Sequence, residues 1–151
     1  MAATGRRAAG VLTNFCGIVL LTYGIPASPA RADASSDARA QVAAVAEALT
    51  ADDAVQAMTH FAKSFPDYDK LRLYFEGLSA FQVENQLEIT DEQDTPKNVA
   101  LTITWDITLT DIGSDRSRRR TGEIHVKLIP VESKWRIVEF SPIDIFNPQI
   151  R

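Results

Sequence analysis

Two tyrosines and two carboxylates are the side chains of this sequence best placed for acid–base chemistry. Tyr68 and Tyr74 fall on the apolar stripe of a predicted helix, where each hydroxyl needs a partner if it is buried; otherwise the rings pack in the core with their hydroxyls in water. Glu139 shares a predicted strand face with apolar residues, and Asp144 follows that strand. In a desolvated pocket a carboxylate can approach a neutral pKa, and a tyrosine can donate to a developing oxyanion.

Four arginines form the concentrated positive charge of the chain. Arg116, Arg118, Arg119 and Arg120 stand at the start of a predicted strand, just after a turn. They predict either contact with an anion, such as a phosphate-bearing ligand, a lipid headgroup or an acidic partner, or a solvated hairpin edge whose charges discourage aggregation.

Other kinds of site have less support. Asp106 and His125 alternate with apolar residues and are expected on the outer sheet face, while His60 flanks an apolar helix stripe. Two isolated histidines leave no local cluster of metal ligands. Neither a glycine-rich phosphate loop nor a nucleophile elbow occurs. The sequence therefore predicts no metal and no cofactor.

Residues 1–32 are predicted to be a secretory signal. Arg6 and Arg7 precede an apolar run from Ala8 to Ile25, and Ala30-Arg31-Ala32 has the small-x-small pattern of a cleavage site. Cleavage there, or two residues later, places the mature chain in the periplasm or outside the cell, with membrane contact only during export. The alternative is an uncleaved N-terminal membrane anchor.

Residues 33–151 are predicted to form one domain. They contain 13 basic and 20 acidic side chains, a formal charge of −7, which argues against nucleic acid as a partner. They contain no cysteine, so the fold must rest on its apolar core.

Three amphipathic helices are expected first. The spacing of apolar residues predicts a helix over 37–49, with Ser35 or Ser36 as its cap. A second helix begins after Thr50 and keeps an apolar face up to Phe65, where Phe65-Pro66 interrupts it. The third covers 68–78.

Strands fill the second half of the chain. A short strand over 83–89 and a polar turn over 91–97 precede Val99–Leu109, whose strict alternation indicates one buried face. Runs over 122–129 and 134–140 complete an antiparallel meander, and both tryptophans, Trp105 and Trp135, are expected in the core. Because the apolar residues of the last run change face, either both of its faces are partly covered or a bulge intervenes.

This order of elements resembles the nuclear transport factor 2-like superfamily, which includes polyketide cyclase-like and ketosteroid isomerase-like proteins. The residues that carry the resemblance are Phe65-Pro66-Asp67-Tyr68, Trp105-Asp106 and the final strand from Lys134 to Phe140. It is closest to exported bacterial members of unassigned function. The resemblance implies an α+β, cystatin-like cone in which three N-terminal helices pack on a strongly curved antiparallel sheet of about four strands.

The resemblance also implies a pocket in the open end of the cone and, often, a homodimer through the convex sheet face, where Thr102, Thr104 and Thr108 form a row. We expect an exported domain that binds a small apolar ligand or a protein without catalysis. The alternative is an isomerase, cyclase or dehydratase. Convergence of at least two of the four acid–base candidates in one cavity would favour the enzyme.

Overall fold

The computed structural model describes residues 29–150, so residues 1–28 of the predicted signal segment (1–32) lie outside the described residues. Three helices precede four strands, as expected. The elements are α1 (Pro29–Thr50), α2 (Ala54–Met58), α3 (Tyr68–Gly77), a 3-10 turn (Leu78–Ala80), β1 (Phe81–Thr95), β2 (Asn98–Asp111), β3 (Ser117–Val131), β4 (Lys134–Ser141) and a second 3-10 turn (Asp144–Phe146).

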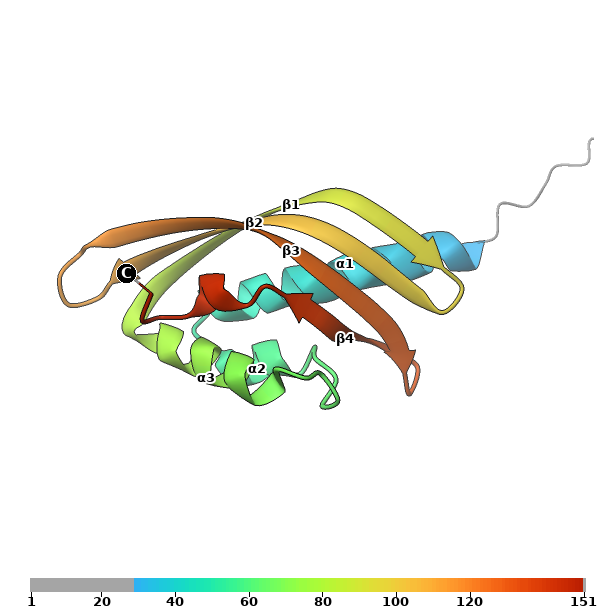
Figure 1. Ribbon diagram of the computed structural model, residues 1–151, viewed down its shortest axis with the longest axis horizontal. Coiled ribbons are helices and arrows are strands. Elements are labelled where there is room, and N and C mark those ends of the chain that lie inside the picture. The colour runs from blue at the N-terminus through green and yellow to red at the C-terminus, as the bar shows by residue number, and fades with distance from the viewer. Residues whose placement is uncertain (1–28, 151) are drawn as a thin grey trace, which may run out of the picture.

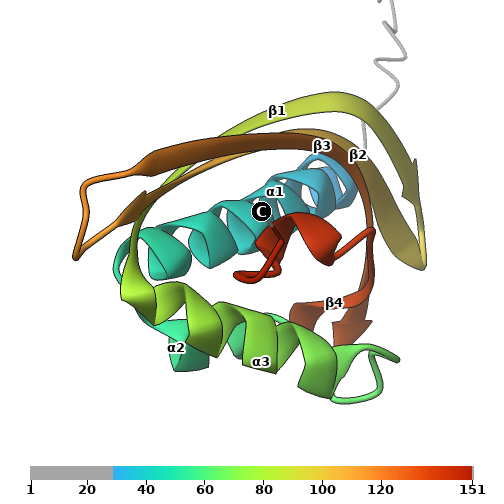
Figure 2. The ribbon, with the colours of Figure 1, turned by 60° about the vertical axis from the view of Figure 1, so that its left-hand side comes forward.

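The four strands form one antiparallel sheet in the order β1-β2-β3-β4. The sheet is strongly curved and arches over α1, while α2 and α3 close the far side of the molecule (Figures 1 and 2). The second 3-10 turn lies inside this arch (Figure 2). The expected α+β cone is therefore confirmed.

Large apolar side chains fill the interior of the cone. The inward residues of β2 are at most 2% exposed, as their alternation predicts. Trp105 packs edge-on against Phe146 and Phe140, with ring centroids 5.2 and 5.9 Å away. Phe140 in turn contacts Phe61 at 5.3 Å. Among residues 29–150 no polar or charged residue is fully buried, so this core holds no buried acid–base group.

Helix α1 begins earlier than its apolar spacing predicts. It starts at Pro29 instead of residue 37, and proline is tolerated in a first helical turn because the N–H it lacks has no partner there. Ser35 is not a cap: its hydroxyl donates to Glu92 on β1, which also accepts from Arg39 Nε at 2.7 Å. The predicted cleavage site after Ala32 falls within this helix, and the signal remains a prediction.

Helix α2 is much shorter than expected and ends at Met58. The following segment instead pairs with the outer edge of β4: Ala62 N donates to Ile137 O at 2.8 Å, and Ile137 N donates to His60 O at 2.9 Å. An open strand edge exposes unpaired backbone groups. Covering it satisfies these groups and overrides the helical pattern.

Strand β1 runs through the predicted polar turn and ends only at Thr95. A register shift between Ile89 and Asp91 marks a bulge at Thr90, whose hydroxyl donates to Thr102 O at 3.2 Å. Beyond the bulge β1 continues to pair with β2. The strand therefore includes the polar residues after residue 89, where local composition predicted its end.

A second bulge decides the faces of β4. Leu128 pairs with Ile137 but Lys127 pairs with Glu139, which leaves Val138 as the extra residue. Ile137 and Phe140 can then both point inward. Glu139 points outward, 64% exposed and 3.4 Å from Lys127 Nζ. The inward orientation expected in the absence of a bulge therefore does not occur, and the alternative with a bulge holds.

Candidate functional site

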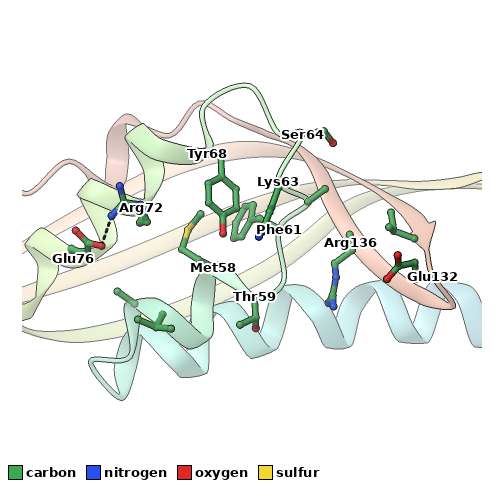
Figure 3. Close-up of a pocket in the computed structure, with 14 residues that line it drawn as sticks. Met58, Thr59, Phe61, Lys63, Ser64, Tyr68, Arg72, Glu76, Glu132 and Arg136 are labelled. Atoms are coloured by element: carbon green, nitrogen blue, oxygen red, sulfur yellow. Dashed lines mark hydrogen bonds and ion pairs between the residues drawn. The ribbon is translucent and has the colours of Figure 1, made fainter.

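A groove of about 720 Å³ opens beside the core, between α2, the segment after it, α3 and the β3–β4 turn. We call it the α2–α3 groove. Figure 3 shows the side chains of Met58, Phe61 and Tyr68 together at its centre. The groove is lined by Ala54, Val55, Met58, Thr59, Phe61, Ala62, Lys63, Ser64, Tyr68, Arg72, Glu76, Val131, Glu132 and Arg136.

Local sequence features build the walls of the groove. Asp53 caps α2 by accepting from Gln56 N at 2.8 Å, whereas the Thr50 hydroxyl donates to Ala46 O within α1. Pro66 separates α2 from α3, so that Tyr68 becomes the first residue of α3 and lies half-buried against the core. On the opposite wall, the β3–β4 hairpin turns through Glu132 and Ser133, both in the left-handed region.

Charged side chains occupy the two ends of the groove. At one end Arg72 pairs with Glu76 at 2.9 Å (Figure 3). At the other lie Arg136 and Glu132 (Figure 3), and Lys63 lines the same wall as Phe61. No ion pair or side-chain hydrogen bond of Lys63, Glu132 or Arg136 occurs among residues 29–150.

His60 lies behind this wall, half-buried, with its Nδ1 2.7 Å from Gln41 Oε1. The pKa of His60 is lowered below its usual value. Burial is the larger cause, and the positive charge of Arg136 is the second. The imidazole is therefore held in its neutral form over a wider pH range than a free histidine.

We expect the protein to lose stability as the pH falls below the usual histidine pKa of 6.5. Because the pKa of His60 is lowered in the folded state, the unfolded chain binds the proton at a higher pH, and the stabilisation present above 6.5 is lost as the pH falls toward the folded-state pKa. Denaturant midpoints at pH 7.5 and 5.5 measure this. The fall between them should be smaller in His60→Gln, but unchanged in a variant of the exposed His125, His125→Gln.

Of the four acid–base candidates, Tyr68 lines the groove and the other three do not. The Tyr74 hydroxyl is 3.4 Å from Asn147 Nδ2, near the C-terminal segment. Asp144 is exposed and 3.8 Å from Lys70 Nζ. Tyr74 and Asp144 both lie next to Lys70, whose Nζ is 5.5 Å from the Tyr74 ring centre, but neither lines the groove, and Glu139 is on the outer face.

No protein-family model matches the chain, and no curated protein matches it by sequence. Solved structures match it in shape. A conserved protein from Planctomyces limnophilus superposes with a TM-score of 0.67 at 11% identity, over 73% of this chain and 94% of that one. A candidate scytalone dehydratase from Novosphingobium aromaticivorans gives 0.63 at 8%, over 70% and 80% of the chains, and an NTF-2-like protein of unknown function from Shewanella oneidensis gives 0.56 at 12%, over 70% and 95%. This chain has the nuclear transport factor 2-like fold. At these identities the likeness extends to the fold alone.

This domain, with its nuclear transport factor 2-like fold, departs in one respect from the cone that the resemblance implies. The space under the curved sheet is filled by Trp105, Phe140 and Phe146, and the α2–α3 groove lies outside that cluster. Sequence reasoning missed the groove because Met58 and Phe61 read as one helical stripe. Because α2 ends at Met58, Phe61 belongs to the non-helical segment that follows, and the two side chains line a groove instead of one helix face.

The four arginines of the cluster do not act as one unit. Arg120 Nη1 donates to Ile145 O at 2.9 Å and to Asn147 O at 2.6 Å, and Nη2 donates to Ile150 O. Arg119 binds Asp106 through two nitrogens, at 3.3 and 3.0 Å. Arg118 lies over the Phe81 ring at 5.3 Å. Arg116 and Arg118 line a hollow of about 770 Å³ at the β2–β3 turn, and contact of the cluster with an anion remains a prediction.

Asn85 is a structural polar residue that sequence reasoning did not single out. It accepts from Trp105 Nε1 at 2.9 Å and donates to Ala46 O and Thr50 Oγ1, each at 3.1 Å. Asn85 thus satisfies the indole N–H of the central tryptophan and ties β1 to the end of α1. An asparagine inside an alternating strand is the signal that could have found it.

Two further features concern possible partners. The convex face is polar: Asp106 accepts from Arg119 and from the Thr121 hydroxyl, and a homodimer through this face stays a prediction. In the described part of the chain no three His, Cys, Asp or Glu side chains gather as a metal site. Within residues 29–150 no helix has the length and apolar character of a membrane span.

Proposed function

We propose that this domain binds a small ligand with an apolar body in the α2–α3 groove, without catalysis. The observation that carries the proposal is the apolar floor of Met58, Phe61 and Tyr68 in a groove of about 720 Å³ beside a filled core. This volume is in the range of small-molecule sites, which are mostly apolar and contain a few polar groups. The polar groups here are the charged side chains at the two ends.

The dispersal of the acid–base candidates supports binding over catalysis. A general acid or base acts on a substrate within hydrogen-bond reach and needs positioned partners. Tyr68 is the candidate that lines the groove, and the carboxylates of Glu139 and Asp144 are exposed elsewhere. The candidate dehydratase among the structural neighbours shares the fold at 8% identity, and that likeness carries no activity over to this groove.

We also propose that residues 33–151 act outside the cytoplasm after loss of the signal. The support is the organisation of residues 1–32, with Arg6 and Arg7 ahead of an apolar run and a cleavage pattern at Ala32. Binding in the groove does not depend on this proposal, since the groove residues all lie after residue 53.

Tyr68→Ala is expected to weaken binding of a neutral apolar probe, 1-decanol, by about tenfold, because the loss of ring contact area corresponds to about 1.4 kcal/mol. Tyr74→Ala is the matched control: it removes another half-buried tyrosine from the same helix, one that does not line the groove. Titration calorimetry measures both, with thermal melting to establish that each variant is folded. Tyr68→Phe should bind as the native chain does.

Three results would overturn the proposal. The first is no binding of 1-decanol to the native chain. The second is equal losses in Tyr68→Ala and Tyr74→Ala, which would place the probe elsewhere. The third is turnover of a carbonyl substrate that Tyr68→Phe abolishes, since the hydroxyl would then be a catalytic donor.

A further inference from the structure

Arg136 is a half-buried cation that faces the α2–α3 groove with no carboxylate partner among residues 29–150. Charged side chains that lose part of their hydration are normally paired. The polar groups nearby do not serve this purpose: His60 is held neutral and bonds to Gln41, and Thr59 donates its hydroxyl to Gln56 O at 2.6 Å. The guanidinium therefore retains donors for a group that enters the groove.

The charges that line the groove do not balance. Three cations, Lys63, Arg72 and Arg136, face two carboxylates, Glu76 and Glu132. Within the lining, Arg72 and Glu76 neutralise each other at 2.9 Å; Arg72 also lies 3.8 Å from Asp69, an exposed carboxylate outside the lining. Lys63 and Arg136 then exceed Glu132 by one positive charge. A ligand with a single negative charge would balance the groove, whereas a neutral ligand would leave the excess and a dianion would reverse it.

The backbone beneath Arg136 is held on both sides. Arg136 pairs with Ile129 of β3, and the next residue, Ile137, bonds to His60 and Ala62 at distances of 2.9 and 2.8 Å. The Arg136 side chain therefore extends from a strand that is paired along both of its edges. The planar pair of donors of the guanidinium matches the two oxygens of a carboxylate.

The apolar floor adjoins this cation. Met58, Phe61 and Tyr68 lie between the Arg72–Glu76 pair and Arg136 (Figure 3). Resting on the proposed function, we infer that the ligand is a small amphiphile with one carboxylate, whose head binds Arg136 with Lys63 nearby, and whose apolar body lies on Met58, Phe61 and Tyr68.

Decanoate and 1-decanol test this inference, because they have the same chain length and differ in the charge of the head. At pH 7.5, and below the concentration at which decanoate forms micelles, calorimetry should give at least tenfold tighter binding of decanoate. Raising the salt concentration should reduce decanoate binding and leave 1-decanol binding unchanged. Decyl phosphate, a dianion at this pH, should bind more weakly than decanoate.

Arg136→Gln should reduce the decanoate preference to less than twofold and leave 1-decanol binding unchanged. Lys134→Gln is the matched control: it removes the same charge from an exposed position on the same strand outside the groove, and should keep the preference.

The result that overturns the inference is 1-decanol binding with no preference for decanoate in the native chain, or a preference that survives Arg136→Gln. Tighter binding of decyl phosphate also overturns it. These results differ from failure of the proposed function, in which neither decanoate nor 1-decanol binds. The native comparison needs no variant and holds even if Arg136→Gln does not fold.

Discussion

Trp105→Ala should lower the free energy of unfolding by about 3–5 kcal/mol, through lost burial and the cavity it leaves. Trp105 is completely buried and packs edge-on against Phe140 and Phe146. Its removal also leaves the side-chain oxygen of Asn85 without the indole donor, which adds to the loss. Denaturant unfolding followed by circular dichroism measures the change.

Trp135→Ala is the matched control for this prediction. Trp135 also lies on the concave side but is only partly buried, packed against the core near the β3–β4 turn. Its replacement should therefore cost about half as much as that of Trp105. Equal losses in the two variants would contradict the assignment of Trp105 as the centre of the core.

Arg120→Ala should lower the free energy of unfolding by roughly 2–3 kcal/mol, since hydrogen bonds from a charged donor are stronger than neutral ones. The guanidinium donates to three carbonyls of the C-terminal segment, those of Ile145, Asn147 and Ile150. That segment carries Phe146 into the core. Urea unfolding should show an earlier midpoint, and limited proteolysis should show faster loss of the C-terminal residues.

Arg119→Ala is the matched control for Arg120. Its side chain is 65% exposed and its partner is Asp106 on the convex face. An exposed ion pair of this kind contributes little to stability, because water and salt screen it, so this variant should unfold close to the native midpoint. If Arg119→Ala destabilised the chain as much as Arg120→Ala, the assignment of Arg120 as the anchor of the C-terminal segment would be wrong.

The division of these arginines shows why local charge did not predict their roles. Four arginines in five residues indicate a charged surface patch, but successive side chains on a strand point to opposite faces. Arg118 and Arg120 share one face of β3, and Arg119 takes the other with Asp106. Whether each guanidinium has a partner depends on which carboxylates of the sheet or carbonyls of the C-terminal segment lie on the same face.

The fold was predictable because its strongest signals are local. The alternation of β2 from Val99 to Leu109 fixes which face is buried, and every inward residue of that run is buried. The presence of helices at the start and the antiparallel meander follow from periodicity and turn chemistry in the same way.

The α2–α3 groove was not predictable, because it depends on contacts between distant segments. The apolar pattern from Ala54 to Phe65 is compatible with one helix, and it is the pairing of His60 and Ala62 with Ile137 that ends α2 at Met58. Likewise, alternation alone leaves Glu139 on either face. The bulge at Val138, which lets both Ile137 and Phe140 reach the core, turns it outward.

The sequence by itself thus determined the order of elements and the buried face of the central strand, since each depends on residues within a few positions of one another. The tertiary structure alone decided which candidate lines a cavity and which arginines are bound within the protein. It also decided where an unpaired cation faces an apolar floor. Those features depend on backbone pairing and charge balance between α2, α3 and β4, which meet only after the sheet has curved around its aromatic core.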